Sequence, residues 1–177
     1  MSTQGTGLNT GPLLMSDPCA ALRRATRAVT HLYDLVLSPT GLKATQFVLL
    51  HAIHQRGEIA QWRLADEHGV GVDTLSRRLA VLRNDGLITF RIGVERPGEK
   101  LYRLTALGET RWRESLPAWE RAQERLQKVL GIEQWNLLLK ITSQVAAEAR
   151  RAETARLVNT GPPKAFAASV SDGRSEA

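Results

Sequence analysis

The chain has 177 residues, enough for one domain with its own hydrophobic core, with or without tails. Its formal net charge of +6 at pH 7 favours an anionic partner, either nucleic acid or a membrane surface. One cysteine excludes an internal disulfide framework, and the lack of a long apolar run or signal-peptide pattern predicts a cytoplasmic protein without a membrane span.

The N-terminal part reads as an arm followed by a long helix. Residues 1–16 are rich in small and polar side chains, which predicts a disordered arm. Asp17 and Pro18 then suit the start of a helix over residues 17–37, because a carboxylate can cap it and proline loses no hydrogen bond in the first turn. One side of this helix is apolar, so it either packs on the core or serves as a dimerisation element. A second helix, at about residues 43–54, is expected to pack beneath the segment that follows it.

Residues 61–84 contain two short helical patterns that meet at Gly69, where a left-handed backbone conformation can end a helix. In the second helix Leu75, Leu79 and Leu82 share one face. Either Gly71 or Asp73 suits its N-cap. The opposite face is an ordinary solvated surface or a surface that reads the DNA major groove. The candidate DNA-binding residues on it are Asp73, Thr74, Ser76, Arg77 and Asn84.

Two β-prone runs follow, at residues 87–92 and 101–104, separated by a turn that contains Pro97 and Gly98. A helix, a turn, a helix and a hairpin in this order predict a winged helix, with a reading head over residues 43–104. Positive side chains on the hairpin are candidates for contacts with DNA phosphates. They are Arg91, Arg96, Lys100 and Arg103.

Residues 105–157 are predicted to form two further helices. Thr105 caps the first, and apolar residues from Trp112 to Leu130 recur at the spacing of a helix–helix seam. A second seam runs from Trp135 to Ala152. We expect both seams and the helix of residues 17–37 to pair between two copies of the chain, in preference to packing within one copy. Residues 158–177 are predicted to be a disordered tail.

Three stretches carry a resemblance to a known family: residues 41–50, residues 64–77 and residues 104–108, the last reading Leu-Thr-Ala-Leu-Gly. Over residues 17–157 the chain resembles the multiple antibiotic resistance regulator (MarR) family. The resemblance implies a mainly α winged helix-turn-helix fold with a small β-wing, N- and C-terminal dimerisation helices, and a small aromatic or phenolic effector. One departure concerns the wing, because Arg96 and Gly98 stand where the family usually has Asp-x-Arg, and Glu95, Arg96 and Glu99 supply similar chemistry out of register.

Cys19 is a candidate redox residue. It lies in the first turn of the predicted helix, where the peptide dipole favours a thiolate and Arg23 would help. Hydroperoxide-sensing members of the family have a reactive cysteine at this place and a tyrosine that corresponds to Tyr33. Another tyrosine of that pocket is replaced by Arg23, and the alternative is a small, inert, buried cysteine.

No motif for catalysis or a cofactor is found. A Gly-rich phosphate loop, a Cys-x-x-Cys pair and a His-Glu-x-x-His pair are all missing. His51 and His54 lie one helical turn apart, but a metal site would also need His31 or His68, so packing or surface roles are favoured. We predict no metal, no cofactor and no enzymatic activity.

The sequence therefore predicts a dimeric DNA-binding transcriptional regulator, a repressor that a small ligand releases from a pseudo-palindromic operator on double-stranded DNA. One alternative is a peroxide-sensing repressor that uses Cys19 as its switch. An alternative of another class is a winged-helix module that binds protein rather than DNA.

Overall fold

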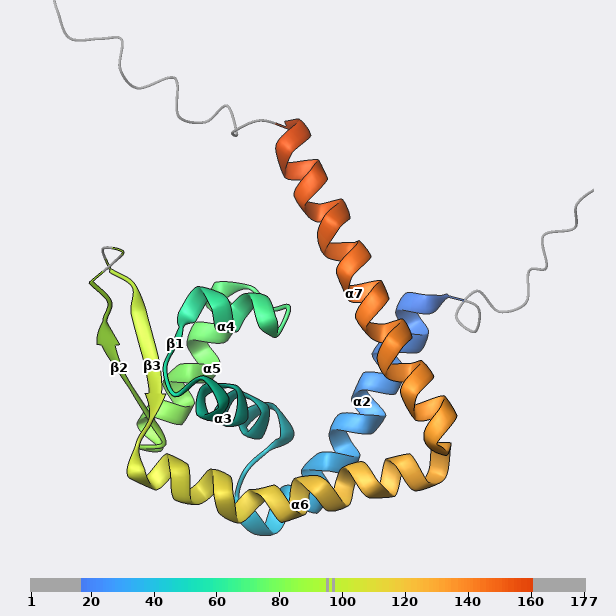
Figure 1. Ribbon diagram of the computed structural model, residues 1–177, viewed down its shortest axis with the longest axis horizontal. Helices are drawn as coiled ribbons and strands as arrows, with labels where there is room; N and C mark the ends of the chain where they lie inside the picture. The colour runs from blue at the N-terminus through green and yellow to red at the C-terminus, as the bar shows by residue number, and fades with distance from the viewer. Residues whose placement is uncertain (1–16, 95, 97, 161–177) are drawn as a thin grey trace, which may run out of the picture. The chain divides into compact units, whose positions relative to one another are not determined.

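The computed structural model describes residues 17–160 except residues 95 and 97. The fold is mainly helical with one small antiparallel sheet, as predicted (Figure 1). The chain divides into two compact units, Met1–Val129 and Leu130–Ala177. In chain order the elements are α2 (Pro18–Leu37), η1 (Ser38–Thr40), α3 (Ala44–Arg56), β1 (Ile59–Ala60), α4 (Gln61–Glu67), α5 (Val72–Asn84), β2 (Ile88–Ile92), β3 (Lys100–Leu104), α6 (Ala106–Leu130) and α7 (Ile132–Thr160).

The sheet has the strand order β1-β3-β2. Strands β2 and β3 form the predicted hairpin, and β1 adds a third, two-residue strand against β3. Ile59 on β1 and Phe90 on β2 both lie opposite Tyr102 on β3. Strand β1 was not predicted, because two residues are too few to show the alternation that marks a strand.

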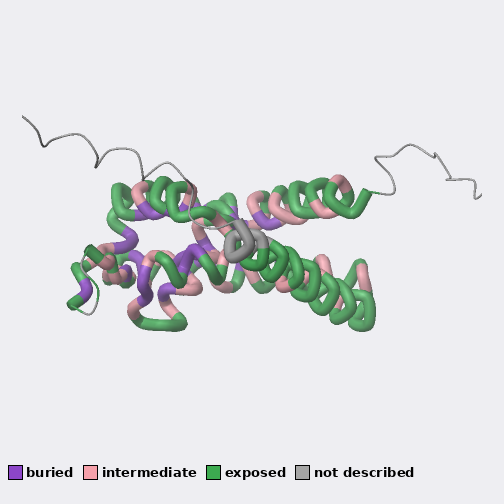
Figure 2. The backbone as a smooth tube through the Cα atoms, turned by 90° about the horizontal axis from the view of Figure 1, so that it is seen from above, coloured by how far each residue is buried: buried purple, intermediate pink, exposed green. Residues whose placement is uncertain are grey.

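The core of the first unit is formed by the apolar faces that the sequence indicated. Leu75, Leu79 and Leu82 of α5 are fully or almost fully buried, as expected. They belong to one cluster with Phe47 and Ile53 of α3. In Figure 2 the buried positions run through several elements of the chain. This packing fixes which side of α5 remains exposed to solvent.

The turn between α4 and α5 settles the choice of cap. Gly69 has a φ of 59°, and the Val70 N–H donates to the Ala65 carbonyl over 3.0 Å. The N-cap of α5 is Gly71, and Asp73 lies inside the first turn. A carboxylate there still interacts favourably with the positive end of the helix dipole.

Thr105 and Gly108 join the wing to α6. The Thr105 hydroxyl donates to the Gly86 carbonyl over 2.6 Å and accepts the Gly108 N–H over 3.0 Å, so Thr105 caps α6 as predicted. A Cβ atom at residue 108 would lie only 1.9 Å from the Leu87 carbonyl oxygen. Glycine is therefore required for α6 to pass this close to the start of the hairpin.

The first half of the intermolecular seam expected on α6 packs within its own chain, and pairing between two copies stays a prediction for the rest of the seam. Trp112, Ser115 and Ala118 are buried within their own chain. The Trp119 ring lies 4.6 Å from Phe47 and 4.4 Å from Tyr33, measured between ring centroids. A periodic apolar face indicates that a helix is covered but does not identify the covering partner. Here α2 and α3 of the same chain cover it.

Helix α7 differs from α6, because none of its residues whose side chains are described is buried. It ends at Thr160, so residues 158–160, which were predicted to begin the disordered tail, are helical instead. The predicted N-terminal arm and residues 161–177 lie outside the described residues. None of the described helices is long and apolar enough to cross a membrane.

Candidate nucleic-acid interface

The polar face predicted for α5 is on the surface. Asp73, Ser76, Arg77 and Asn84 are exposed, and Thr74 is half-buried. The three buried leucines on the opposite side hold this face outward. A helix that is anchored by one face and carries short polar side chains and an arginine on the other can approach the base edges in a major groove.

Ser76 has a partner that the sequence analysis did not identify. The Gln61 side-chain amide donates to the Ser76 hydroxyl over 2.6 Å, and the Tyr102 hydroxyl donates to the Gln61 carbonyl oxygen over 3.4 Å. Gln61 therefore links α4 to both α5 and strand β3. No local pattern distinguishes this glutamine, because its two partners lie 15 and 41 residues away.

The four wing cations differ in their surroundings. Arg91 forms a two-pronged ion pair with Glu58, at 2.9 Å and 2.5 Å, and this hydrogen bonding raises the pKa of Arg91 above its ordinary value. Lys100 lies over the Phe90 ring at 5.2 Å, and Arg96 lies over the Trp62 ring at 5.0 Å. Arg103 is exposed on β3. Glu58 already pairs with the guanidinium group of Arg91. The predicted contact of Arg91 with a phosphate would therefore have to use the same guanidinium group.

Among the cavities formed by the described residues of the first unit, two are relevant to function. One, of about 470 Å³, lies beside the wing and is lined by the end of α3, the loop after it, β1, α4 and the hairpin, with residues that include Arg56, Glu58, Trp62, Arg91, Arg96 and Glu99. The other, of about 290 Å³, is formed by α2, α3 and α6. Its lining is mostly apolar and consists of Val29, Thr30, Tyr33, Ala44, Thr45, Val48 and Trp119.

Cys19 and Tyr33 do not meet within one chain. Asp17 caps α2 as predicted, accepting the Cys19 N–H over 3.0 Å, and Cys19 is exposed rather than buried. Tyr33 is buried, which raises its pKa above the ordinary value of 10.0. Because the two residues lie fourteen positions apart on the same α-helix, a rise of 1.5 Å per residue separates them by about 21 Å. Cys19 and Tyr33 of one chain therefore do not contact each other, and the redox role of Cys19 stays a prediction.

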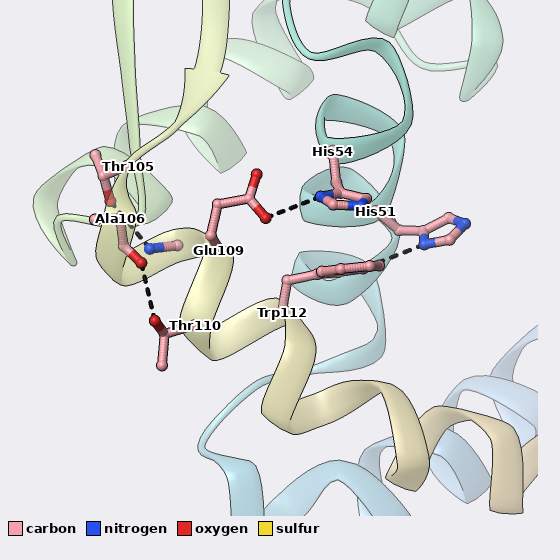
Figure 3. Close-up of polar contacts among 8 residues, drawn as sticks. His51, His54, Thr105, Ala106, Glu109, Thr110 and Trp112 are labelled. Atoms are coloured by element: carbon pink, nitrogen blue, oxygen red, sulfur yellow. Dashed lines mark hydrogen bonds and ion pairs between the residues drawn. The ribbon is translucent and has the colours of Figure 1, made fainter.

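His51 and His54 belong to a joint between α3 and α6 (Figure 3). His54 Nδ1 lies 2.9 Å from a Glu109 carboxylate oxygen, and the His54 ring stacks on Trp112 with centroids 3.5 Å apart. The Trp112 indole N–H donates to His51 Nδ1 over 3.2 Å, so His51 accepts there and is neutral. Among the described residues no group of three or more His, Cys, Asp or Glu side chains could hold a metal. The two histidines serve to connect the reading head to α6.

An anchored, exposed polar helix beside a hairpin with positive side chains defines a winged-helix DNA-binding protein. No family model and no curated protein matches the chain. Among solved structures, the M. tuberculosis transcriptional regulator MosR in complex with DNA is 31% identical, with a TM-score of 0.70, and the match covers 80% of this chain and 100% of that chain. The chain belongs to the MarR family of transcriptional regulators, which are not enzymes.

Two further structures share the fold at lower identity. A mutant of E. coli MarR complexed with operator DNA is 20% identical, with a TM-score of 0.68, over 77% of this chain and 99% of that one. The transcriptional repressor CouR bound to p-coumaroyl-CoA is 22% identical, with a TM-score of 0.68, over 78% of this chain and 97% of that one. The structural likeness thus extends over both the reading head and the helices around it.

The His51–Trp112 hydrogen bond predicts a pH-dependent stability. Burial, and then the charge of His54, lower the pKa of His51 below its ordinary value of 6.5. The contribution of this contact is therefore full above pH 6.5 and is lost as the pH falls toward the lowered pKa. We expect the free energy of unfolding from urea melts to fall between pH 7.5 and 5 by up to about 1 kcal/mol through this residue, since solvent screens a half-exposed ring.

His51→Gln is the matched control, because glutamine can still accept the indole N–H but does not titrate. The variant should lose that part of the pH dependence, whereas the contribution of His68, whose pKa is also lowered by burial, stays in both proteins. Equal pH slopes for the wild type and His51→Gln would contradict the prediction.

Proposed function

We propose that the protein is a cytoplasmic, dimeric transcriptional repressor that binds a pseudo-palindromic operator and is released from it by a small ligand. The observation that carries the DNA-binding part is the exposed polar face of α5, fixed in place by Leu75, Leu79 and Leu82. The net charge of +6 and the cations of the wing add sequence-independent attraction to phosphates.

The mechanism that we propose is geometric. A two-fold dimer presents two copies of α5 at a separation of about 34 Å, so that they enter successive major grooves on one side of the duplex. A ligand that alters this separation breaks the register of both helices with the DNA. Repression then ends without any covalent chemistry.

The DNA contacts are tested by Arg77→Ala and Arg96→Ala on a duplex that the wild-type protein selects from a randomised library. Arg77 lies on α5, so its removal should weaken binding to the selected duplex by about 1–3 kcal/mol. Arg96 lies on the wing, so its removal should weaken binding to all duplexes alike and reduce the salt slope by roughly one. Gel shifts at several salt concentrations measure both effects.

Arg125→Ala is the control, because it removes one exposed positive charge of α6 outside α5 and the wing. It should leave the preference for the selected duplex intact. A flat salt dependence for the wild type, or no effect of Arg77→Ala in a protein that melts normally, would favour the alternative of a module that binds protein.

The dimer proposal rests on α7. Its exposed apolar side chains include Leu137, Leu138, Leu139, Ile141 and Val145, whose exposed fractions range from 38% to 54%. Exposing such a helix to water is unfavourable, and a second copy of the same helix offers a complementary apolar surface. The proposed dimer role of residues 17–37 stays a prediction.

Leu138→Glu should convert the dimer to a monomer and abolish binding to the selected duplex, because a carboxylate would be buried in the contact. Gln134→Glu, an exposed polar position on the same helix, is the matched control and should remain dimeric. Light scattering at micromolar concentration gives the mass. A wild-type monomer, or a Leu138→Glu dimer, would refute the assignment of α7.

The ligand proposal rests on the 290 Å³ cavity formed by α2, α3 and α6. The rings of Tyr33 and Trp119 contribute to its lining, and its volume suits a compound with one or two rings. Because α3 lies in the reading head and α2 and α6 flank it, a ligand there can change their relative positions. Aromatic acids and phenols are the proposed class.

Thr30→Phe should fill the cavity and make DNA binding insensitive to benzoate or phenol, each of which is expected to release the wild-type protein. Thr110→Phe places the same side chain at an exposed position of α6 and should respond like the wild type. Gel shifts titrated with each compound measure release. Equal release of Thr30→Phe and wild type, or release by an organic hydroperoxide that Cys19→Ser prevents, would replace this cavity with the thiol alternative.

A further inference from the structure

Trp62 lies where α4 meets the wing, and it makes two contacts with the hairpin. Its indole N–H donates to the Glu99 carboxylate over 2.8 Å. The face of the same ring carries the Arg96 guanidinium at 5.0 Å from the centroid. One side chain of the helix-turn-helix thus holds two residues of the hairpin turn.

Backbone hydrogen bonds within the hairpin fix the position of Glu99. The Gly93 N–H donates to the Glu99 carbonyl over 2.8 Å, and the Glu99 N–H donates to the Arg96 carbonyl over 3.1 Å. A Cβ atom at Gly93 would lie 2.8 Å from the Glu99 carboxylate and 3.4 Å from its Cβ. Gly93 therefore leaves the space that the Glu99 side chain occupies when it accepts the indole N–H of Trp62.

The arginine that lies over the Trp62 ring keeps its ability to bind an anion. A guanidinium group lying over a ring presents its N–H donors in its own plane, at the edge of the ring, where a phosphate or a base can reach them. An arginine held in this way loses less side-chain freedom on binding than one that is unrestrained. Gln61, which precedes Trp62, forms a hydrogen bond with Ser76 on α5. The start of α4 therefore contacts both α5 and the wing.

We propose that Trp62 is a positioning residue for the wing: it holds Glu99 with its indole N–H and Arg96 with its ring face, and it thereby orients Arg96 toward DNA relative to α5. The inference rests on the DNA-binding function proposed above. It assigns Trp62 no contact with DNA of its own. It also makes Glu99, an acidic residue, favourable for binding a polyanion.

Double-mutant cycles on the selected duplex test the coupling. Trp62→Ala should weaken binding about fivefold and Arg96→Ala about tenfold, and the double variant should be no weaker than Arg96→Ala, because Trp62 acts through Arg96. Trp62→Phe keeps the ring without the N–H and should be intermediate. The same cycle with Arg103, which does not contact Trp62, should be multiplicative. Multiplicative losses for Trp62 and Arg96 would overturn the proposal.

For Glu99→Ala, the direction of the change in DNA affinity distinguishes the proposal from a simple effect of charge. Removing a carboxylate near DNA raises affinity when only charge matters. If Glu99 holds Trp62, its removal should instead lower affinity, whereas Glu114→Ala, an exposed acid on α6, should not. Higher affinity for Glu99→Ala would overturn the proposal.

The hydrogen bond between Trp62 and Glu99 can be measured without DNA. The chain has four tryptophans, and Trp62→Phe identifies the indole N–H resonance of Trp62 in a ¹⁵N correlation spectrum. That resonance should shift upfield in Glu99→Ala and move little in Arg103→Ala. An unchanged resonance overturns the inference even if DNA binding is intact, whereas a shifted resonance in a protein that binds no duplex means that the proposed function has failed.

Discussion

The close approach of α6 to the start of the hairpin is the constraint on which the rest of the first unit depends. The Thr105 hydroxyl fixes the strand-to-helix corner, and Gly108 lets the helix pass against the Leu87 carbonyl. This sets the direction of α6, so that Trp112 reaches the histidines of α3 and Trp119 reaches Tyr33 and Phe47. A backbone contact at one residue thus determines where three helices meet.

The packing of α6 against α2 and α3 also connects the reading head to the apolar cavity. The apolar cavity and the His51–Trp112–His54–Glu109 contacts both lie between the reading head and the helices around it. Packed interfaces of this kind respond to a ligand or a proton by moving as units, since their interiors cannot be compressed. In the proposed mechanism, an effector in the cavity would act on the placement of α5 rather than on its surface.

Three of the four positive side chains of the wing are each held by a specific neighbouring side chain. Glu58 compensates Arg91, Phe90 lies under Lys100, and Trp62 lies under Arg96. These contacts give Arg91, Lys100 and Arg96 a defined place, whereas Arg103 is exposed. Where the wing departs from the family's Asp-x-Arg pattern, the Glu99 carboxylate accepts the indole N–H of Trp62 on α4.

Local patterns in the sequence determined the helix start at Asp17 and Pro18, the buried leucine face of α5 and the hairpin, because each depends on residues a few positions apart. Only the tertiary structure decided that Trp112 and Trp119 pack within their own chain, that Gln61 connects α5 to the wing, and that Trp62 connects α4 to the wing. A pattern of apolar or polar residues shows which side of a helix or strand is covered, but not which residues cover it. The partner of Trp112 lies 61 residues away and that of Trp62 lies 37 residues away, and only the folded chain brings them together.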